Sequence, residues 1–303
     1  MTHPNPKHST PGTTPGTLYV VGTPIGNLSD ITLRALEVLR AVDVVAAENV
    51  GHTKSLCQHY GIRKRVSPYH QHNQNTQTRT ILGWLLSGKD VALVTDAGTP
   101  GISDPGVHLI DGAVRKAVPV RPIPGPSAVI TALSISGLPT AHFVFLGFLS
   151  SKRSKRRKEL RALRDEPRTM VFFESPHRLM EMLKDLKEIL GNRQMVLHKE
   201  MTKVFEEAKR ANVVEILAEL AHQRIRGEYT LVVCGRDGKQ PQKAQINKRI
   251  MDRIESLLEA RDQSLRDIAE TISREEGLQY RDIYKRCLRT KNDLENQCRH
   301  GIH

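Results

Sequence analysis

The stretch LYVVGTPIGNLSDITLRALEVLRAV, residues 18–42, contains the unit from which the fold is predicted. Residues 18–21 are apolar and β-prone, which favours a short strand that ends before a loop starting at Gly22. In the segment after this loop, apolar residues recur at helical spacing. A second apolar run follows at residues 44–47. A strand, a helix and another strand in this order predict a parallel sheet with helices on its faces.

Strands and helices continue to alternate along the chain. A second α/β block begins near Phe143, and beyond Gly238 a polar segment leads into segments with helical periodicity that resemble a small helix-turn-helix unit. The sequence therefore predicts an α/β protein with two α/β domains and a small C-terminal helical unit. The expected parts are a flexible tail at residues 1–16, an N-terminal α/β domain at 17–141, a C-terminal α/β domain at 142–238, a linker at 239–246 and the helical unit at 247–303.

Composition excludes several classes of protein. The 303 residues include 46 Lys and Arg against 33 Asp and Glu, a formal charge of +13, and 38% hydrophobic residues, which argues against wholesale disorder. Four widely spaced cysteines argue against a disulfide framework or a zinc finger. The N-terminal residues lack the apolar segment of a signal peptide, and Gly137 and Pro139 interrupt the uncharged residues 128–151. We therefore expect a cytoplasmic protein without a membrane span, and the positive charge favours an anionic partner such as nucleic acid.

Three loops at predicted strand ends are rich in glycine and proline. They span residues 22–27, 96–106 and 124–128. Ligands of open α/β sheets bind at the carboxyl ends of the strands, and these loops would form a stiff cleft that offers backbone hydrogen-bonding groups. The sequence contains neither GxGxxG nor GxxxxGK[ST], so it does not predict a classical dinucleotide site or a P-loop. A small polar ligand fits this cleft better.

Seven motifs in sequence order indicate a family. They are TPIGNLSDITLRALEVL, DAGTPGISDPG, PIPGPSA, SGLP, ESPHRL, KEMTK-FEE and GEYTLVV. Together they closely resemble the ribosomal RNA small-subunit methyltransferase I family within the tetrapyrrole methylase superfamily, over residues 17–235 and the helical unit. The resemblance implies a two-domain enzyme, usually a homodimer, that binds S-adenosylmethionine in a cleft between its domains. It also implies methyl transfer to the ribose 2′-hydroxyl of a cytidine in small-subunit ribosomal RNA, either free or in the assembled subunit.

The resemblance also implies which residues contact the cofactor, mainly through backbone groups and apolar surfaces. From the first domain these are Pro24, Asp96, Ala97, Gly98, Ile102, Ser103, Ser127, Ala128 and Thr131. From the second domain they are Phe173, Met201, Gly227, Tyr229 and Thr230.

Methyl transfer from a sulfonium is an in-line displacement, so aligning the reacting atoms supplies much of the catalysis. A ribose hydroxyl is a weak nucleophile at neutral pH, so a proton acceptor or a polarising cation is expected nearby. The catalytic candidates are Asn27, Glu48 and Lys203. Glu48 could instead be a helix N-cap or part of a surface ion pair, and Asn27 could simply close a turn. No metal is expected, because His70 and His72 have no evident third ligand.

Residues 48–53 depart from the family pattern. They read Glu-Asn-Val-Gly-His-Thr, whereas the family commonly has Glu-Asp-Thr-Arg followed by His-Thr. The chain therefore lacks a carboxylate at Asn49, a hydroxyl at Val50 and a guanidinium at Gly51. We expect these changes to affect turnover or the choice of nucleotide more than cofactor binding. An alternative function is therefore an RNA- or ribosome-binding relative with weakened catalysis.

Basic residues provide the RNA-binding hypothesis. Arg153, Arg157 and Arg161 recur at helical spacing and would form a positive stripe, while His177 and Arg178 precede a helix whose N-terminus can meet a phosphate. A solvated inter-domain helix is the alternative for the stripe. A small-molecule tetrapyrrole methylase is another alternative function, but it would need neither the stripe nor the helical unit.

Overall fold

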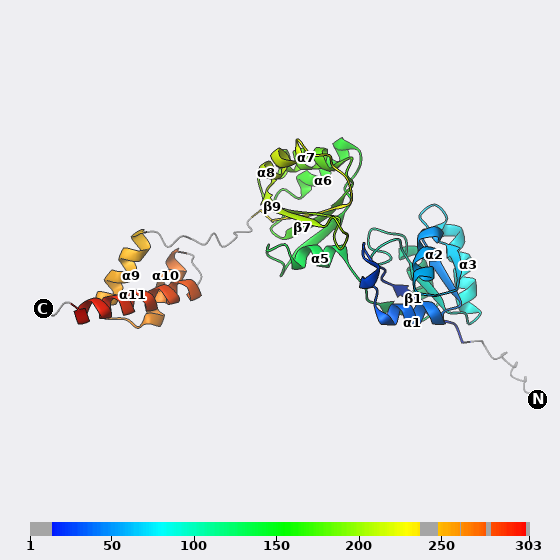
Figure 1. Cartoon of the computed structure of the whole chain (residues 1–303), viewed down its shortest axis with the longest axis horizontal. Helices are drawn as coiled ribbons and strands as arrows, with labels where there is room; N and C mark the ends of the chain where they lie inside the picture. Colours follow the sequence, from blue (N-terminus) through cyan, green and yellow to red (C-terminus); the bar gives the residue numbers. More distant parts are fainter. Residues whose placement is uncertain (1–13, 237–247, 261, 277–279, 301–303) are drawn as a thin grey trace, which may run out of the picture. The chain divides into compact units, whose positions relative to one another are not determined.

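The computed structural model describes residues 14–236, 248–260, 262–276 and 280–300. Its internal contacts divide the chain into two compact units, Met1–Arg236 and Asp237–His303 (Figure 1). Most of the predicted tail and the whole predicted linker lie outside the described residues.

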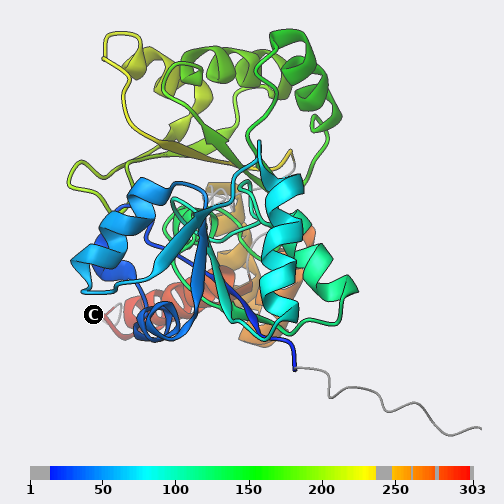
Figure 2. The ribbon, with the colours of Figure 1, turned by 90° about the vertical axis from the view of Figure 1, so that its right-hand side faces the viewer.

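The first sheet of the larger unit is parallel and has the strand order β3-β2-β4-β1-β5. Its strands are β1 (Leu18–Val21), β2 (Val44–Ala47), β3 (Arg65–Pro68), β4 (Val91–Val94) and β5 (Val120–Ile123). Its helices are α1 (Leu33–Ala41), α2 (Val50–His59), α3 (Gln74–Leu86) and α4 (Val107–Arg115), and a short 3₁₀ turn, η1 (Leu28–Asp30), precedes α1. One apolar core includes side chains of α1 and α2, and another includes side chains of α3 and α4. Helices therefore cover both faces of this sheet (Figure 2).

The second sheet is mixed, with the order β6-β7-β10-β8-β9, and only β6 and β7 pair in parallel. Its strands are β6 (Phe143–Gly147), β7 (Thr169–Glu174), β8 (Gln194–Lys199), β9 (Glu207–Asn212) and β10 (Tyr229–Val233). One face packs against α6 (Arg153–Ala162), α7 (Leu179–Leu190) and α8 (Val213–Leu220), and the other packs against α5 (Ala128–Ser134) (Figure 1). The predicted α/β class is confirmed.

The smaller unit is helical. It contains α9 (Lys248–Ala260), α10 (Leu265–Glu276) and α11 (Tyr280–His300), whose core is formed mainly by isoleucines. The last helix continues to His300, because no glycine or proline interrupts the chain between Tyr280 and Gly301. Within the described segments, no helix is both long and apolar enough to cross a membrane.

Candidate functional site

A cavity of about 440 Å³ opens among the ends of strands from both sheets. The first sheet contributes the loop after β4 and Glu48 at the end of β2, and α5 contributes its first turn. The second sheet contributes the ends of β7 and β8 and the start of β10. The lining residues are Ile25, Glu48, Asp96, Ala97, Gly98, Thr99, Ile102, Asp104, Ser127, Ala128, Val129, Phe148, Phe173, Glu174, Ser175, Pro176, His198, Glu200, Met201, Glu228, Tyr229 and Thr230.

Backbone hydrogen bonds fix the loops that shape this cavity. Thr23 and Gly98 exchange backbone hydrogen bonds of 2.9 and 3.1 Å, which connect the loop after β1 to the loop after β4. Gly98 adopts a φ of 72°, a conformation that side chains with a Cβ disfavour. The glycines and prolines of the sequence therefore produce the stiff cleft that was predicted.

Most of the predicted cofactor residues are brought together here. Asp96, Ala97, Gly98, Ile102, Ser127, Ala128, Phe173, Met201, Tyr229 and Thr230 line the cavity. Pro24 instead lines an adjoining cavity of about 220 Å³ that shares Asp96. Ser103, Thr131 and Gly227 are outside the lining.

Several lining residues were not predicted as site residues, and three of them are chemically important. Asp104 lies in a loop that the sequence singled out, but nothing distinguished this carboxylate from its neighbours. Phe148 follows the end of β6, and His198 lies inside an apolar strand. For His198, the only sequence signal was a histidine within the apolar run MVLHK. This run otherwise resembles an ordinary buried strand, so the sequence did not indicate a site residue.

Three carboxylates concentrate negative charge on the first-sheet side of the cavity. Glu48, Asp96 and Asp104 all line it, and Glu48 Oε2 accepts a 3.3 Å hydrogen bond from the Asp96 backbone N–H. Burial raises the pKa of Glu48, and the charge of Asp96 adds to this rise. Burial and the charges of Glu48 and Asp96 raise the pKa of Asp104 to about 6. This side of the cavity therefore favours a cationic group.

Glu48 faces the cavity rather than capping a helix. The N-cap of α2 is Asn49, whose Oδ1 accepts from the backbone N–H groups of Gly51 and His52 at 2.9 and 3.2 Å. An aspartate would accept the same two hydrogen bonds, so the replacement of aspartate by Asn49 leaves the start of α2 intact. The effect of Asn49 is therefore the loss of a negative charge and not of the helix start, beside the hydroxyl missing at Val50 and the guanidinium missing at Gly51.

The structure argues against two of the catalytic predictions. Asn27 is exposed and caps η1, accepting a 3.0 Å hydrogen bond from Ser29 N–H, so it closes a turn. Lys203 Nζ donates to Glu200 at 3.0 Å and to Glu228 at 2.9 Å. Burial acts to lower the pKa of Lys203, but these carboxylates outweigh it and raise the pKa. The raised pKa favours the protonated form of Lys203, which suits a polarising cation better than a proton acceptor, and Lys203 is outside the cavity lining.

Comparison with known proteins agrees with this architecture. Residues 17–217 match the family model of tetrapyrrole (corrin/porphyrin) methylases. A Micromonospora olivasterospora protein named ribosomal RNA small subunit methyltransferase I is 51% identical over 221 residues, or 73% of this chain and 71% of the relative. A Synechocystis protein of the same name is 41% identical over 283 residues, or 92% of this chain and 99% of the relative.

The chain belongs to the ribosomal RNA small subunit methyltransferase I family. This confirms the resemblance seen in the seven motifs. Solved structures agree on the fold. Thermus thermophilus uroporphyrin-III C-methyl transferase complexed with S-adenyl homocysteine has a TM-score of 0.53 at 20% identity, covering 72% of this chain and 97% of that one. The methyltransferase CobJ has a TM-score of 0.57 at 16% identity, covering 73% and 94%.

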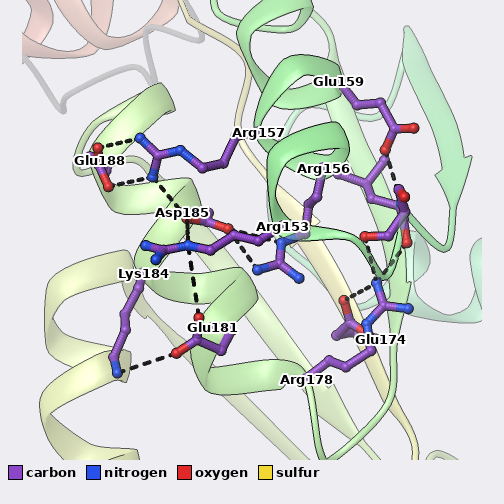
Figure 3. Close-up of polar contacts among 12 residues, drawn as sticks. Arg153, Arg156, Arg157, Glu159, Glu174, Arg178, Glu181, Lys184, Asp185 and Glu188 are labelled. Atoms are coloured by element: carbon purple, nitrogen blue, oxygen red, sulfur yellow. Dashed lines mark hydrogen bonds and ion pairs between the residues drawn. The ribbon is translucent and has the colours of Figure 1, made fainter.

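The basic helix α6 differs from the free stripe that the sequence predicted. Asp185 of α7 is fully buried and accepts hydrogen bonds from Arg156 at 2.7 and 2.9 Å and from Arg157 at 2.9 Å, with Arg153 at 3.4 Å (Figure 3). Arg157 also pairs with Glu188. Arg153 and Arg157 therefore connect α6 to α7. Of the three predicted arginines, Arg161 is exposed and makes no ion pair with α7 within the described residues.

Arg178 is also engaged within the protein. Its Nη2 donates to the Leu149 carbonyl at 2.6 Å and to Glu174 at 3.2 Å, and its Nε lies 3.2 Å from the same carboxylate (Figure 3). Glu174 is buried at the cavity end of β7. Arg178 therefore orients a carboxylate of the site, which argues against its predicted role in holding a phosphate, whereas the neighbouring His177 is exposed.

Proposed function

We propose that this protein transfers a methyl group from S-adenosylmethionine to the 2′-hydroxyl of a cytidine ribose in small-subunit ribosomal RNA. The observation that carries the proposal is the cavity between the two sheets, with an acidic side and an aromatic side, in a chain whose relatives are named for small-subunit ribosomal RNA methylation. We also propose that it acts as a homodimer in the cytoplasm, where its ribosomal substrate is found.

The residues of the cavity suit this cofactor. Its volume is in the range that small-molecule sites occupy. The carboxylates of Glu48, Asp96 and Asp104 complement the positive charge of a sulfonium. On the opposite side Phe173 packs against Phe145 and Phe148, with ring centroids 4.9 and 5.6 Å apart, and offers an aromatic surface for adenine. When bound, the cofactor supplies an electrophilic methyl group.

The protein's contribution to catalysis is alignment and proton acceptance. The hydrogen-bonded loops after β1 and β4 hold one side of the cavity rigid, which favours in-line geometry. Glu48 is the candidate that faces the cavity, and its raised pKa brings the carboxylate closer to the basicity that a general base needs. We therefore assign proton acceptance from the ribose hydroxyl to Glu48.

RNA contact is assigned to the exposed side of α6. Lys155, Lys158 and Arg161 are exposed, and among the described residues none of them pairs with a carboxylate of α7, although Arg161 borders a hollow that Arg157 and Glu188 also line. Together with the exposed His177 they can contact phosphates without breaking internal ion pairs. Replacing Lys155, Lys158 and Arg161 together by glutamate is expected to weaken RNA binding and flatten its salt dependence, while cofactor affinity stays unchanged.

Methyl transfer to small ribosomal subunits that lack the modification tests the proposal. Transfer of a labelled methyl group from S-adenosylmethionine, followed by nucleoside mass spectrometry, is expected to yield 2′-O-methylcytidine. Transfer to a tetrapyrrole without RNA would support the small-molecule alternative. Tight RNA binding without methyl transfer would support a weakened relative, for which the departure at Asn49, Val50 and Gly51 is the motivating observation.

A further inference from the structure

His198 lies in the middle of a row of side chains that crosses the second sheet. In the strand register Thr230 of β10 pairs with Phe173 of β7 on one side and with His198 of β8 on the other. Side chains at paired positions point to the same face, and all three residues line the cavity. The histidine is therefore part of the cavity wall formed by the second sheet.

The imidazole is buried without a partner. His198 is only 1% exposed, and neither ring nitrogen makes a hydrogen bond of normal geometry with the described part of the chain. Leaving buried polar atoms unpaired costs about 1–3 kcal/mol for each group. The Ala132 backbone interacts with the ring, but without the geometry of a normal hydrogen bond, so an apolar residue would avoid most of this cost.

The surroundings keep this imidazole neutral. Burial, followed by the positive charge of Arg210, lowers the pKa of His198 to about 4, while a backbone contact with Ala132 and the charge of Glu206 act in the opposite direction. Arg210 is held in place by a 2.5 Å hydrogen bond from its Nη2 to the Ile135 carbonyl. At neutral pH His198 therefore presents one N–H donor and one acceptor nitrogen.

The two sides of the cavity differ in the ligand groups that they suit. The carboxylates of Glu48, Asp96 and Asp104 suit a cationic group. Glu174, Glu200 and Glu228 also line the cavity from the second-sheet side, but each is paired with a cation, Arg178 for Glu174 and Lys203 for the other two. Between them, the row of Phe173, Thr230 and His198 carries no formal charge when the imidazole is neutral. A neutral imidazole beside an aromatic ring suits an uncharged, flat, hydrogen-bonding group. In S-adenosylmethionine this description fits the adenosine half and not the sulfonium half.

We propose that His198 is a specificity-determining residue whose imidazole hydrogen-bonds to the adenosine half of bound S-adenosylmethionine. The assignment rests on the proposed function, because it takes that cofactor as the ligand. A histidine that exchanges no hydrogen bond within the protein gains one in the complex, so His198 discriminates in favour of ligands that offer a polar edge at this wall.

Calorimetric titration of two ligands into the full-length protein tests the assignment. The ligands are S-adenosylmethionine and 5′-methylthioadenosine, which keeps the adenosine but lacks the amino-acid end and the positive charge. His198→Leu is expected to lower the affinity for both by about tenfold, and His198→Gln, which keeps a donor and an acceptor, is expected to retain more affinity than His198→Leu. Unchanged affinity for both ligands in His198→Leu would overturn the assignment. So would a loss confined to S-adenosylmethionine, because it would place the contact at the amino-acid end.

Stability and a control variant separate ligand binding from folding. His198→Leu replaces unpaired buried nitrogens by carbon, so its urea midpoint is expected to equal or exceed that of the wild type. A purely structural histidine would instead give a lower midpoint in this variant. Leu197→Val, on the same strand but facing the core of the opposite face, is expected to lose some stability and keep both affinities.

A magnetic resonance measurement gives a readout on the residue itself. The ring ¹⁵N signals of His198, assigned by their absence in His198→Gln, are expected to shift when 5′-methylthioadenosine saturates the protein. Signals that stay in place during saturation would contradict the contact. Wild-type protein that binds neither ligand would overturn the proposed function together with this assignment, whereas wild-type binding with unaltered variants would overturn the assignment alone.

Discussion

Gly98 shows how a single residue shapes the cavity. Its φ of 72° is unfavourable for any β-branched residue, and a Cβ placed there would reach only the Ile25 side chain, at 3.7 Å. Gly98→Val therefore adds backbone strain and a branched side chain to the cavity lining without a clash in the core. We expect cofactor affinity to fall by at least about tenfold, measured by calorimetry.

Gly191→Val is the matched control for this prediction. Gly191 ends α7 with a φ of 86°, has no heavy atom within 4 Å of a built Cβ, and is outside the cavity lining. Gly191→Val should also lose stability from backbone strain, on the order of 1–3 kcal/mol, but it should keep the cofactor affinity of the wild type. Equal cofactor affinity in the two variants would show that Gly98 does not border the cofactor.

Asp104 makes the stability of the protein depend on pH. Its pKa of about 6 in the folded protein exceeds the ordinary value of 3.8, so the folded state binds the proton more tightly than the unfolded state. Ionised Asp104 therefore destabilises the fold above pH 6, and the cost disappears as the pH falls from 6 to below 4. Asp104→Asn should be more stable than wild type at pH 7.5, by on the order of 1 kcal/mol.

Urea denaturation at several pH values checks this sign. The stability difference between Asp104→Asn and wild type should shrink as the pH falls from 7.5 to 4. Asp30→Asn, an exposed change outside the cavity lining, serves as the control and should leave the pH profile unaltered. A difference that grows on acidification would contradict the assigned environment of Asp104.

At the scale of elements, α6 and α7 are connected by a buried ion pair. Asp185 is 0% exposed and Arg156 is 3% exposed. Burial acts to raise the pKa of Asp185, but the hydrogen bonds from Arg156 and Arg157 outweigh it and lower the pKa. Arg156→Met would remove the main partner of a buried carboxylate, so we expect a loss of about 3 kcal/mol in the free energy of unfolding, measured with urea.

Two further variants, a control and a rescue, test whether the loss of stability comes from the ion pair. Arg161→Met, an exposed change on the same helix, should alter stability by less than about 0.5 kcal/mol. Combining Arg156→Met with Asp185→Leu should recover most of the lost stability, because apolar side chains can replace a buried ion pair. If Arg156→Met behaves like Arg161→Met, the ion pair does not hold α6 against α7.

Apolar periodicity predicted most elements but could not predict their polar contacts. The strands β1 and β2, Leu18–Val21 and Val44–Ala47, are apolar runs, so the sequence alone identified them. The strand β9, EAKRAN, has no such run. It lies at the edge of its sheet, where strands commonly carry charged residues. Helical spacing likewise placed Arg153 and Arg157 on one stripe, but it could not show that α7 supplies Asp185 and Glu188 opposite them.

The same distinction applies to the candidate site. The glycine-rich loop around Gly98 was predictable, because a local pattern at a strand end identifies it. His198 was not, since its importance arises only when Phe173 and Thr230 become its neighbours in the sheet. Lys203 appeared reactive in the sequence, yet Glu228, distant along the chain, contributes to keeping it protonated. Residues whose chemistry depends on distant partners thus require the fold.

At the scale of the whole molecule, charge and cavity belong mainly to the larger unit. Residues 237–303 contain nearly as many acidic as basic residues, so most of the +13 surplus lies in residues 1–236. The cavity lining also lies entirely within that range. The electrostatic part of RNA affinity should therefore come chiefly from the larger unit.

Deleting residues 237–303 tests this division. The larger unit should remain folded, because its apolar clusters are made only of its own residues and the helical unit has a separate isoleucine-rich core. We expect cofactor affinity within about twofold of the full chain, and a slope of RNA affinity against salt concentration that changes little.

Calorimetry measures the cofactor affinity, and fluorescence anisotropy at several salt concentrations measures the slope of RNA affinity. The full chain with Lys155, Lys158 and Arg161 replaced by Glu is the contrasting case. Because each lost phosphate contact flattens the slope by about one, a deletion that flattens it more than that triple variant does would make the helical unit the principal RNA contact.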